Sequence, residues 1–144
     1  MSEATATAIP NRPQAASIVA DSRRMTFLPA LFGPRRMVAG EATIYNVMGQ
    51  LSPEYRGGLW DFLELDGKPL YMRHDGEGRI GIQWHGNGFE GIVSTDAAGI
   101  IACLLAFSSL SFDDPTDLMA DAFHRLREFA LDHPEARTIF RAID

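Results

Sequence analysis

The chain has 144 residues, the length of a single domain, and its thirteen basic and nineteen acidic side chains give a net charge of −6. Hydrophobic residues make up 46% of it and charged residues 22%, which excludes wholesale disorder. The acidic balance argues against a nucleic-acid binder that works by bulk positive charge. Cys103 is the one cysteine, so an intramolecular disulfide is impossible, and a reducing cytoplasmic compartment is favoured.

The N-terminal third predicts a tail followed by two helices. Residues 1–20 hold Ala, Thr, Ser and Pro with few large apolar side chains, and we expect a flexible tail ahead of one domain over residues 21–144. A short helix is predicted over 25–32, where Pro29 is tolerated only in the first turn. A second is predicted over 40–51, because one apolar face is formed by Ile44, Val47, Met48 and Leu51.

Residues 59–93 predict a sheet. Four short runs of β-branched and aromatic residues are separated by Asp-Gly and Asn-Gly dipeptides, which accept the positive φ of tight hairpin turns. The runs are 59–65, 70–74, 79–85 and 89–93. In the third run, Ile80, Ile82 and Trp84 alternate with Arg79, Gln83 and His85. The pattern predicts a four-stranded antiparallel meander with one covered face.

Helices are predicted to cover this face of the sheet. Residues 97–110 are apolar nearly all round, with Ser94 or Thr95 as N-cap and Asp96 in the first turn. Asp114 followed by proline is typical of the start of a second helix, and residues 132–135 precede a short last one. Helices at both ends of a sheet segment indicate an α+β fold, with the C-terminal helices packed on the sheet.

The histidines raise the possibility of a small metal-dependent enzyme. His74 and His85 could face each other across the second hairpin, with Asp75 and Glu77 in the turn between them. Zinc needs three or four converging ligands, whereas these acids lie at a hairpin tip. We therefore favour a solvated hairpin without a metal or other cofactor. Cys103 could serve as a nucleophile only beside a base, and its apolar neighbours favour a small buried side chain instead.

Two nucleic-acid hypotheses depend on charge. Basic residues gather ahead of the sheet, and a weak nucleic-acid binder could use Arg23, Arg24, Arg35 and Arg36. Conversely, an acidic protein could imitate DNA, in which ten base pairs carry roughly twenty phosphates. Nineteen acidic side chains, whose charge is largely balanced by thirteen basic ones, are too few to imitate a long duplex. We expect neither strong direct DNA binding nor extended DNA mimicry.

A series of short motifs, taken in order, resembles the KlcA/ArdB family of antirestriction proteins from about residue 21 to the last residue. The motifs are Arg23-Arg24, Phe27-Leu28-Pro29, Phe32-Gly33, Gly40-Glu41, Ile44-Tyr45-Asn46, Leu51-Ser52, Tyr55, Gly57-Gly58, Trp60, Phe62, Glu64-Leu65, Gly86-Asn87-Gly88-Phe89-Glu90-Gly91, Ser94, Asp96-Ala97-Ala98-Gly99-Ile100, His124-Arg125-Leu126-Arg127, His133-Pro134-Glu135-Ala136 and Arg141-Ala142-Ile143-Asp144. Departures are Leu63, where the family often has an aromatic residue, and Arg73-His74, where it often has Ala-Pro.

The resemblance implies a plasmid or mobile-element protein that protects incoming DNA by inhibiting host type I restriction-modification. It also implies non-catalytic binding to the restriction complex or to a host factor that controls it. Candidate interaction residues are those of the motifs that folding alone does not fully require: Arg24, Glu41, Tyr55, Trp60, Asp96, Glu135 and Asp144. Each also has a purely structural interpretation, such as a helix N-terminus for Asp96 and Glu135, a core position for Trp60 and a local pair with Arg141 for Asp144.

Overall fold

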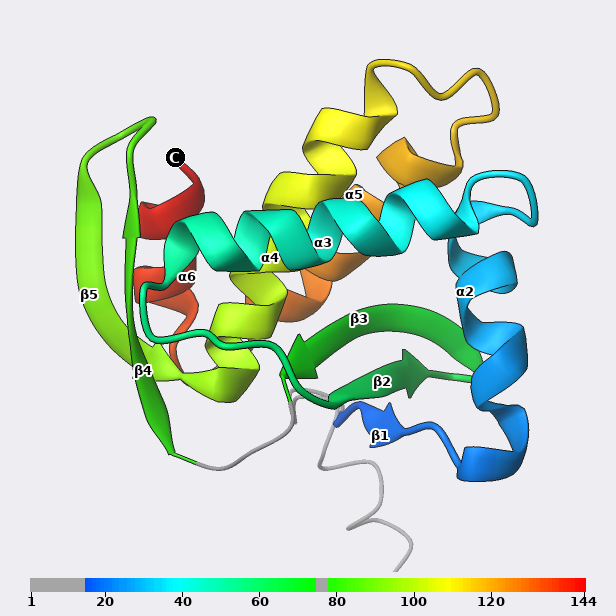
Figure 1. The fold of residues 1–144 in the computed structure, drawn as a ribbon, viewed down its shortest axis with the longest axis horizontal. Coiled ribbons are helices and arrows are strands. Elements are labelled where there is room, and N and C mark those ends of the chain that lie inside the picture. The colour runs from blue at the N-terminus through cyan, green and yellow to red at the C-terminus, as the bar shows by residue number, and fades with distance from the viewer. Residues whose placement is uncertain (1–14, 75–77) are drawn as a thin grey trace, which may run out of the picture.

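A computed structural model describes residues 15–74 and 78–144 of the chain (Figure 1). Helices and strands form an α+β fold, as predicted. In chain order the elements are β1 (Ser17–Ile18), the 3-10 turn η1 (Asp21–Arg23), α2 (Arg24–Phe32), α3 (Met37–Leu51), β2 (Trp60–Leu65), β3 (Lys68–His74), β4 (Arg79–Trp84), β5 (Phe89–Ser94), α4 (Thr95–Ser111), α5 (Leu118–Ala130) and α6 (Ala136–Ile143).

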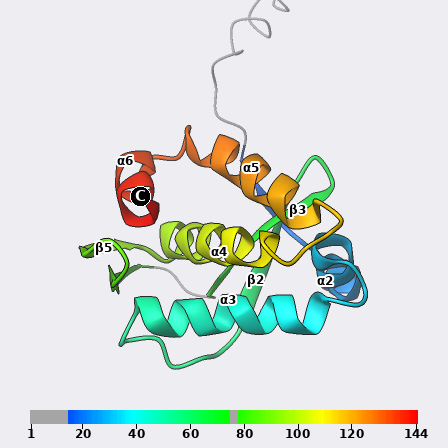
Figure 2. The same cartoon turned by 90° about the horizontal axis from the view of Figure 1, so that it is seen from above.

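Helix α4 lies at the centre of the fold. Viewed from above, α3 lies on one side of it and α5 and α6 on the other (Figure 2). Its side chains are buried on nearly every face because all of these elements pack on it, which explains its lack of a polar stripe. It begins where the sequence predicts: the Ser94 hydroxyl accepts a hydrogen bond from the Ala97 N–H at 3.0 Å.

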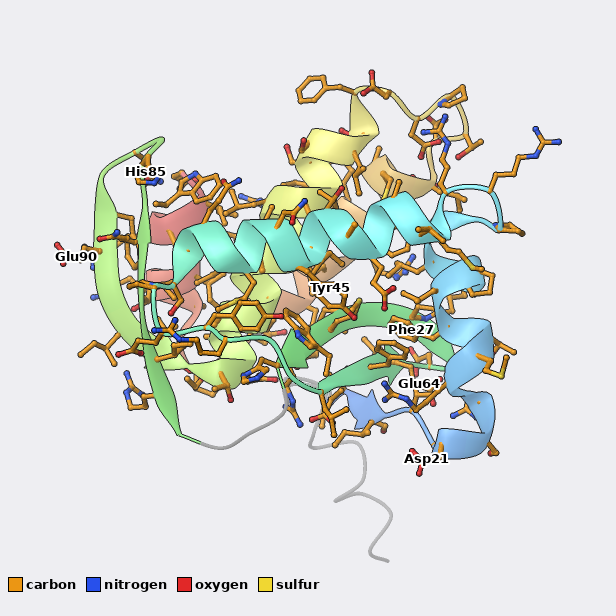
Figure 3. All side chains as sticks on the ribbon, in the orientation of Figure 1. Asp21, Phe27, Tyr45, Glu64, His85 and Glu90 are labelled. Carbon is orange, nitrogen blue, oxygen red and sulfur yellow. The ribbon has the colours of Figure 1, made fainter. Side chains whose placement is uncertain are left out.

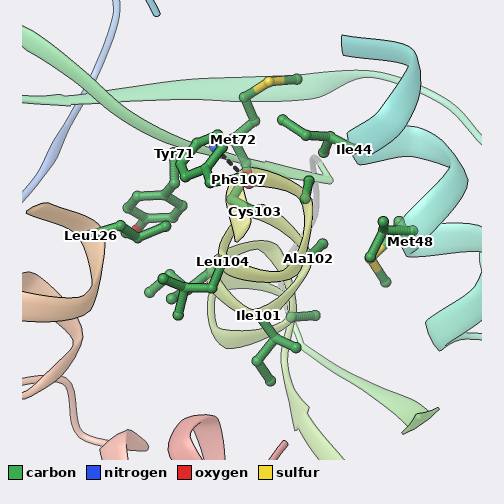
Figure 4. Packing of buried hydrophobic residues seen from close by; sticks show 14 of the residues in the cluster. Ile44, Met48, Tyr71, Met72, Ile101, Ala102, Cys103, Leu104, Phe107 and Leu126 are labelled. Atoms are coloured by element: carbon green, nitrogen blue, oxygen red, sulfur yellow. Dashed lines mark hydrogen bonds between the residues drawn. The ribbon is translucent and has the colours of Figure 1, made fainter. Parts of the chain in front are cut away.

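The core is one continuous cluster around this helix. Cys103, Leu104 and Phe107 of α4 lie beneath Tyr71 and Met72 of β3 in a close view (Figure 4). The predicted apolar face of α3 packs against the other side of α4, and each of its four residues is buried: Ile44, Val47, Met48 and Leu51. At the edge of the core, Phe27 of α2 stacks on Phe62 of β2 with ring centroids 4.5 Å apart.

The four predicted strands form, but the prediction of a single four-stranded meander is wrong. β1, β2 and β3 make one antiparallel sheet, and β4 pairs with β5 in a second. Helix α4 explains the division, because it covers the edge of β3 that β4 would need. There the Met72 N–H donates to Cys103 Sγ at 3.4 Å, and the Cys103 thiol lies 3.6 Å from the Met72 carbonyl. A helix over an edge strand prevents further strand pairing.

The hairpin turns follow their sequence signals. Asp66 and Gly67, between β2 and β3, both have positive φ, as a two-residue turn of primed type requires. Gly88 closes the β4–β5 turn, where its N–H donates to the Trp84 carbonyl at 3.0 Å. The predicted two faces of β4 are confirmed: Ile80 and Ile82 are buried, whereas Arg79, Gln83 and His85 are exposed.

The N-terminal predictions need two corrections. Residues 1–14 of the expected tail lie outside the described residues, but ordered structure begins before residue 21. Ser17 and Ile18 pair with β2, and the buried Val19 donates its N–H to the Phe62 carbonyl at 2.8 Å. Pro29 lies in the second half of α2 and not in the first turn. Having no N–H, Pro29 cannot donate the helical hydrogen bond to the Met25 carbonyl, and α2 ends three residues later, at Phe32, before Gly33 with its φ of 86°.

The start of α5 also differs from the prediction. The helix begins at Leu118, four residues after Asp114. The Asp114 carboxylate nevertheless holds that start, since it accepts hydrogen bonds from the backbone N–H groups of Thr116 and Met119. The Thr116 hydroxyl also donates to this carboxylate, and that bond, followed by the one from the Met119 N–H, lowers the pKa of Asp114. Within the described parts of the chain, no helix is long and apolar enough to cross a membrane.

Candidate functional site

Four of the seven candidate residues lie together in what we call the Trp60 cluster, which consists of Arg24, Glu41, Tyr45, Tyr55, Trp60 and His74. The Trp60 indole is buried between elements α3 and β3 and donates its N–H to the Tyr55 hydroxyl at 3.1 Å. The His74 ring meets Tyr55 edge to face, with centroids 5.3 Å apart. Tyr45 tilts onto the other side of Trp60 at 5.2 Å.

Arg24 and Glu41 complete this cluster. The Arg24 guanidinium donates to the Trp60 carbonyl at 3.1 Å and lies 4.2 Å above the Phe62 ring. The Glu41 carboxylate accepts a hydrogen bond from the hydroxyl of Tyr45, one turn further along α3, at 2.7 Å. Burial, followed by this bond, raises the pKa of Tyr45. These side chains hold α2 and α3 against β2, which is a structural task.

A second group, the Asp96 network, consists of Asp61, Tyr71, Arg73, Asp96 and His133. Asp96 is at the first turn of α4, and its two carboxylate oxygens receive three side-chain donors. Tyr71 and Arg73 donate to Oδ1 at 2.5 and 2.7 Å, and His133 donates to Oδ2 at 2.8 Å. Arg73 also reaches Asp61, from Nε at 3.2 Å. The network joins β2, β3, α4 and the turn before α6.

Glu135 lies beside this network and holds the same turn. Its carboxylate accepts hydrogen bonds from both the backbone N–H and the hydroxyl of Ser94, which is the N-cap of α4. Its own N–H donates to His133 Nδ1 at 2.9 Å. Glu135 therefore stabilises the N-terminus of α4, through Ser94. In the chain, however, Glu135 itself immediately precedes α6.

The electrostatics of the Asp96 network favour a fixed ion pair. Burial would raise the pKa of Asp96, but the bonds from His133, Tyr71 and Arg73 outweigh it and lower the pKa to about 2. Burial and the bond to Asp96 raise the pKa of the Tyr71 phenol. Asp96 is thus an anion and Tyr71 a neutral hydrogen-bond donor at physiological pH. Neither is available as a general acid or base there.

A cleft of about 720 Å³ opens beside this network, and we call it the Asp96 cleft. It lies between residues 15–18, β3, the first turn of α4 and the α5–α6 turn. Polar walls come from Arg73, Ser94, Asp96, Asp132 and His133. Apolar walls come from Ala15, Ala16, Ile18, Leu63, Tyr71, Phe129 and Pro134. This is the largest of the described hollows, and its size is that of an ordinary binding cleft.

Asp144, the seventh candidate, is apart from both groups. It is exposed at the end of α6, and its backbone N–H donates to the Phe140 carbonyl at 3.1 Å. The expected pairing with Arg141 does not form; the Arg141 guanidinium lies 5.7 Å from the Phe89 ring instead. The last turn of α6 is fastened to the β4–β5 turn, where Asn87 donates to the Ala142 carbonyl at 2.9 Å.

The structure separates the two histidines of the metal hypothesis. His74 Nε2 lies 2.9 Å from the Gly57 carbonyl, inside the Trp60 cluster. His85 is exposed at the opposite end of β4, near the tip of the β4–β5 hairpin (Figure 3). Asp75 and Glu77 lie outside the described residues. Among residues 15–74 and 78–144, no group of three or more His, Cys, Asp or Glu side chains is placed to hold a metal ion.

The four arginines of the nucleic-acid hypothesis do not form one patch. Arg23 is paired with Glu64, and Arg24 is part of the Trp60 cluster. Arg35 and Arg36 lie exposed in the turn between α2 and α3, at the other end of α2. The positive charge of Arg36 contributes to the lowered pKa of Asp114.

Cys103 has the environment of a core residue. The side chain is fully buried in α4, and burial raises the pKa of its thiol to about 12. The thiolate needed for nucleophilic attack is therefore disfavoured at neutral pH.

Sequence analysis missed the partners of Asp96. Tyr71 and Arg73 are two residues apart on β3 and so point to the same face of the strand, a signal present in the sequence. Their distance from Asp96 along the chain hid the contact. The sequence places His133 only among the residues that precede the last helix, although its two ring nitrogens connect Asp96 with Glu135.

Comparison with known proteins identifies relatives over nearly the whole chain. A sequence model of the antirestriction protein family matches residues 53–144. Antirestriction protein KlcA of Escherichia coli is 43% identical over 138 residues, which cover 93% of this chain and 97% of the relative. The uncharacterized protein YfjX of Escherichia coli K12 is 35% identical over 133 residues, covering 88% of this chain and 85% of the relative.

A solved structure has the same fold. It superposes with a TM-score of 0.82 and 44% sequence identity, covering 93% of this chain and 99% of the other. This structure is described under KlcA and ArdB proteins, which show a novel fold and antirestriction activity against type I DNA restriction systems in vivo but not in vitro. The family-model match and the KlcA relative each extend over most of the chain, and the resemblance seen in its motifs is confirmed. This chain belongs to the antirestriction protein family.

Proposed function

We propose that this protein protects incoming DNA from type I restriction-modification in the cytoplasm, through non-catalytic binding to a macromolecule. The observation that supports this most strongly is the match over 93% of the chain, at 44% identity, to a protein with antirestriction activity against type I systems. A match of this extent spans nearly the whole chain, so the proposal concerns the whole folded unit.

The chemistry of the described residues agrees with binding and not with catalysis. Asp96 is held as an anion by three donors, and Cys103 is buried with a raised pKa. The candidate residues Arg24, Glu41, Tyr55 and Trp60 are engaged with one another in the Trp60 cluster. A protein whose polar groups are fixed in this way offers a stable surface, which suits recognition of a partner.

The partner is either the restriction complex or a host factor that controls it. The structural relative is active in vivo but not in vitro, which favours a cellular component that a purified reaction lacks. We extend this to the present chain and propose that it acts through such a component. Extended DNA mimicry is not part of the proposal, because the net charge of −6 is small beside that of a duplex.

The test is the plating of unmodified phage on a host with a type I system, with and without this gene. We expect plating to rise when the protein is expressed, and no change in a matched host that lacks the restriction system. Purified restriction enzyme should cut unmodified DNA equally well with and without the protein. Equal plating in both hosts, at equal protein levels, would refute the proposed function.

A further inference from the structure

The Asp96 cleft has walls of two kinds, and their chemistry indicates what it binds. We propose that the cleft takes a segment of a partner protein that presents a lysine or arginine side chain next to an apolar one. This inference rests on the proposed function, because it names the chemistry of the partner through which the protein acts. It concerns the cleft alone and not the Trp60 cluster.

The apolar wall is ready to accept an aliphatic side chain. Ile18 on β1 lines the cleft and leaves 54% of its surface exposed. Phe129 of α5 and Pro134 of the α5–α6 turn line the same hollow. Covering such side chains with an apolar group is favourable, because it removes apolar surface from water.

The polar wall is negative despite its arginine. Arg73 is held between Asp61 and Asp96, with which it makes ion pairs at 3.2 and 2.7 Å. His133 is neutral, because its Nδ1 accepts the Glu135 N–H and so carries no proton. The lining carboxylates are those of Asp96 and Asp132, and Arg73 is the one arginine or lysine in the lining. The two carboxylates outnumber that one positive charge, and Asp61, which is paired with Arg73, adds a further negative charge.

Two of these carboxylates can receive a further donor. Asp96 leaves 28% of its side chain exposed, and its Oδ2 accepts only the His133 bond among the described contacts. The Asp132 side chain is exposed, and no hydrogen bond or ion pair to it is found in the described residues. A carboxylate oxygen accepts more than one bond, so an ammonium or guanidinium group fits here. A phosphate would be repelled, which disfavours nucleic acid as the occupant.

The first test is charge reversal at the rim. Asp132→Lys places a positive charge in the cleft and breaks no side-chain contact of the fold. The matched control is Asp113→Lys, an exposed acid in the loop after the opposite end of α4. We expect Asp132→Lys to lower protection in the phage-plating assay by about tenfold and the control to leave it unchanged. Full protection by Asp132→Lys would overturn the inference while leaving the proposed function intact.

The second test does not depend on restriction. The full-length protein, labelled with nitrogen-15, is titrated with the peptide acetyl-Gly-Leu-Lys-Leu-Gly-amide and with the same peptide carrying Glu in place of Lys. We expect the lysine peptide to shift the backbone amide resonances of Ser94, Asp96 and His133, and the glutamate peptide to bind about tenfold more weakly. The Asp132→Lys substitution should weaken binding of the lysine peptide and leave binding of the glutamate peptide unchanged.

The remaining outcomes all contradict the inference. Equal shifts with both peptides, or none at the cleft, would show that it does not select a basic segment. If a short DNA duplex shifts the amide resonances of the cleft residues, the cleft is a nucleic-acid site. A dimer in sedimentation equilibrium that Asp132→Lys dissociates would assign it to a second copy of the chain. If the wild-type protein fails to protect phage DNA, the proposed function is wrong, and the peptide titration still decides the ligand class.

Discussion

His133 donates a hydrogen bond from Nε2 to Asp96 Oδ2 at 2.8 Å, and only one tautomer of the neutral ring allows it. Nδ1 accepts the Glu135 N–H at 2.9 Å, so the proton of the neutral ring resides on Nε2. A single side chain, 8% exposed, thereby fastens the α5–α6 turn to the first turn of α4. This ring is one of the contacts that position α6, together with the bond from Asn87 to the Ala142 carbonyl.

Replacing this imidazole should loosen the turn. We expect His133→Phe to lower the free energy of unfolding by about 1–3 kcal/mol, because it leaves the Glu135 N–H and one Asp96 oxygen without their partner. Urea denaturation followed by circular dichroism measures the change. Asp132→Asn, at the exposed neighbouring residue, is the control and should stay within about 0.5 kcal/mol of wild type. Equal stability of wild type and His133→Phe would contradict the role given to the ring.

The pH dependence of stability should carry the signature of Asp96. Its pKa falls from 3.8 in the unfolded chain to about 2 in the folded protein, so the ionised form stabilises the fold. This contribution, on the order of 1–2 kcal/mol, is fully present above about pH 4 and is lost as the pH falls through about 2. Urea denaturation of wild type and Asp96→Asn should show a gap at pH 5 that narrows toward pH 2. A constant gap would contradict the shifted pKa.

At Gly99, α4 lies close against the backbone of β3. A Cβ atom there would lie 2.5 Å from the Met72 carbonyl oxygen and 2.8 Å from Arg73 Cα. Since the obstacle is backbone, we expect Gly99→Ala to destabilise the protein by about 1–3 kcal/mol or more. Gly49→Ala is the matched control: nothing lies within 4 Å of its Cβ position on α3, and the change should stabilise the helix by about 0.5–1 kcal/mol. Thermal unfolding compares the two, and equal effects would argue against the close approach.

The Cys103 thiol should be almost inert in the folded protein. It is fully buried, and burial raises its pKa to about 12, so both access and thiolate formation are suppressed. An aromatic disulfide reagent at pH 8 should label it rapidly in urea and very slowly without urea. Rapid labelling under native conditions would show that α4 opens easily from β3, contrary to the packing seen in Figure 4.

Local signals made most of the elements predictable. The hairpins follow from residues such as Asp66 and Gly67, whose preference for positive φ acts within the turn itself. Likewise, Ser94 caps α4 through a bond to a residue three positions along. The division of the strands into two sheets was not predictable in this way. It depends on Cys103, some thirty residues from Met72 in sequence, covering the edge of β3.

The candidate site was predictable only in part. The motifs located Asp96 and Glu135, and the structure places both at the α4 N-terminus beside one cleft. They did not indicate that Arg73 belongs with them, because Arg73 departs from the family pattern, where the position often holds alanine. The contact between Arg73 and Asp96 joins a strand to a helix across 23 residues of chain. Such a contact is a property of tertiary packing and has no local signal.

The cover that α4 provides over β3 has a consequence for synthesis on the ribosome. Chain growth delivers β2 and β3 first, and α4 is complete only when Ser111 has left the exit tunnel. Until then the nascent hairpin displays an unprotected strand edge, which is prone to pair with other chains. The interval between the emergence of residue 74 and that of residue 111 from the tunnel therefore sets how long the newborn protein is vulnerable to aggregation.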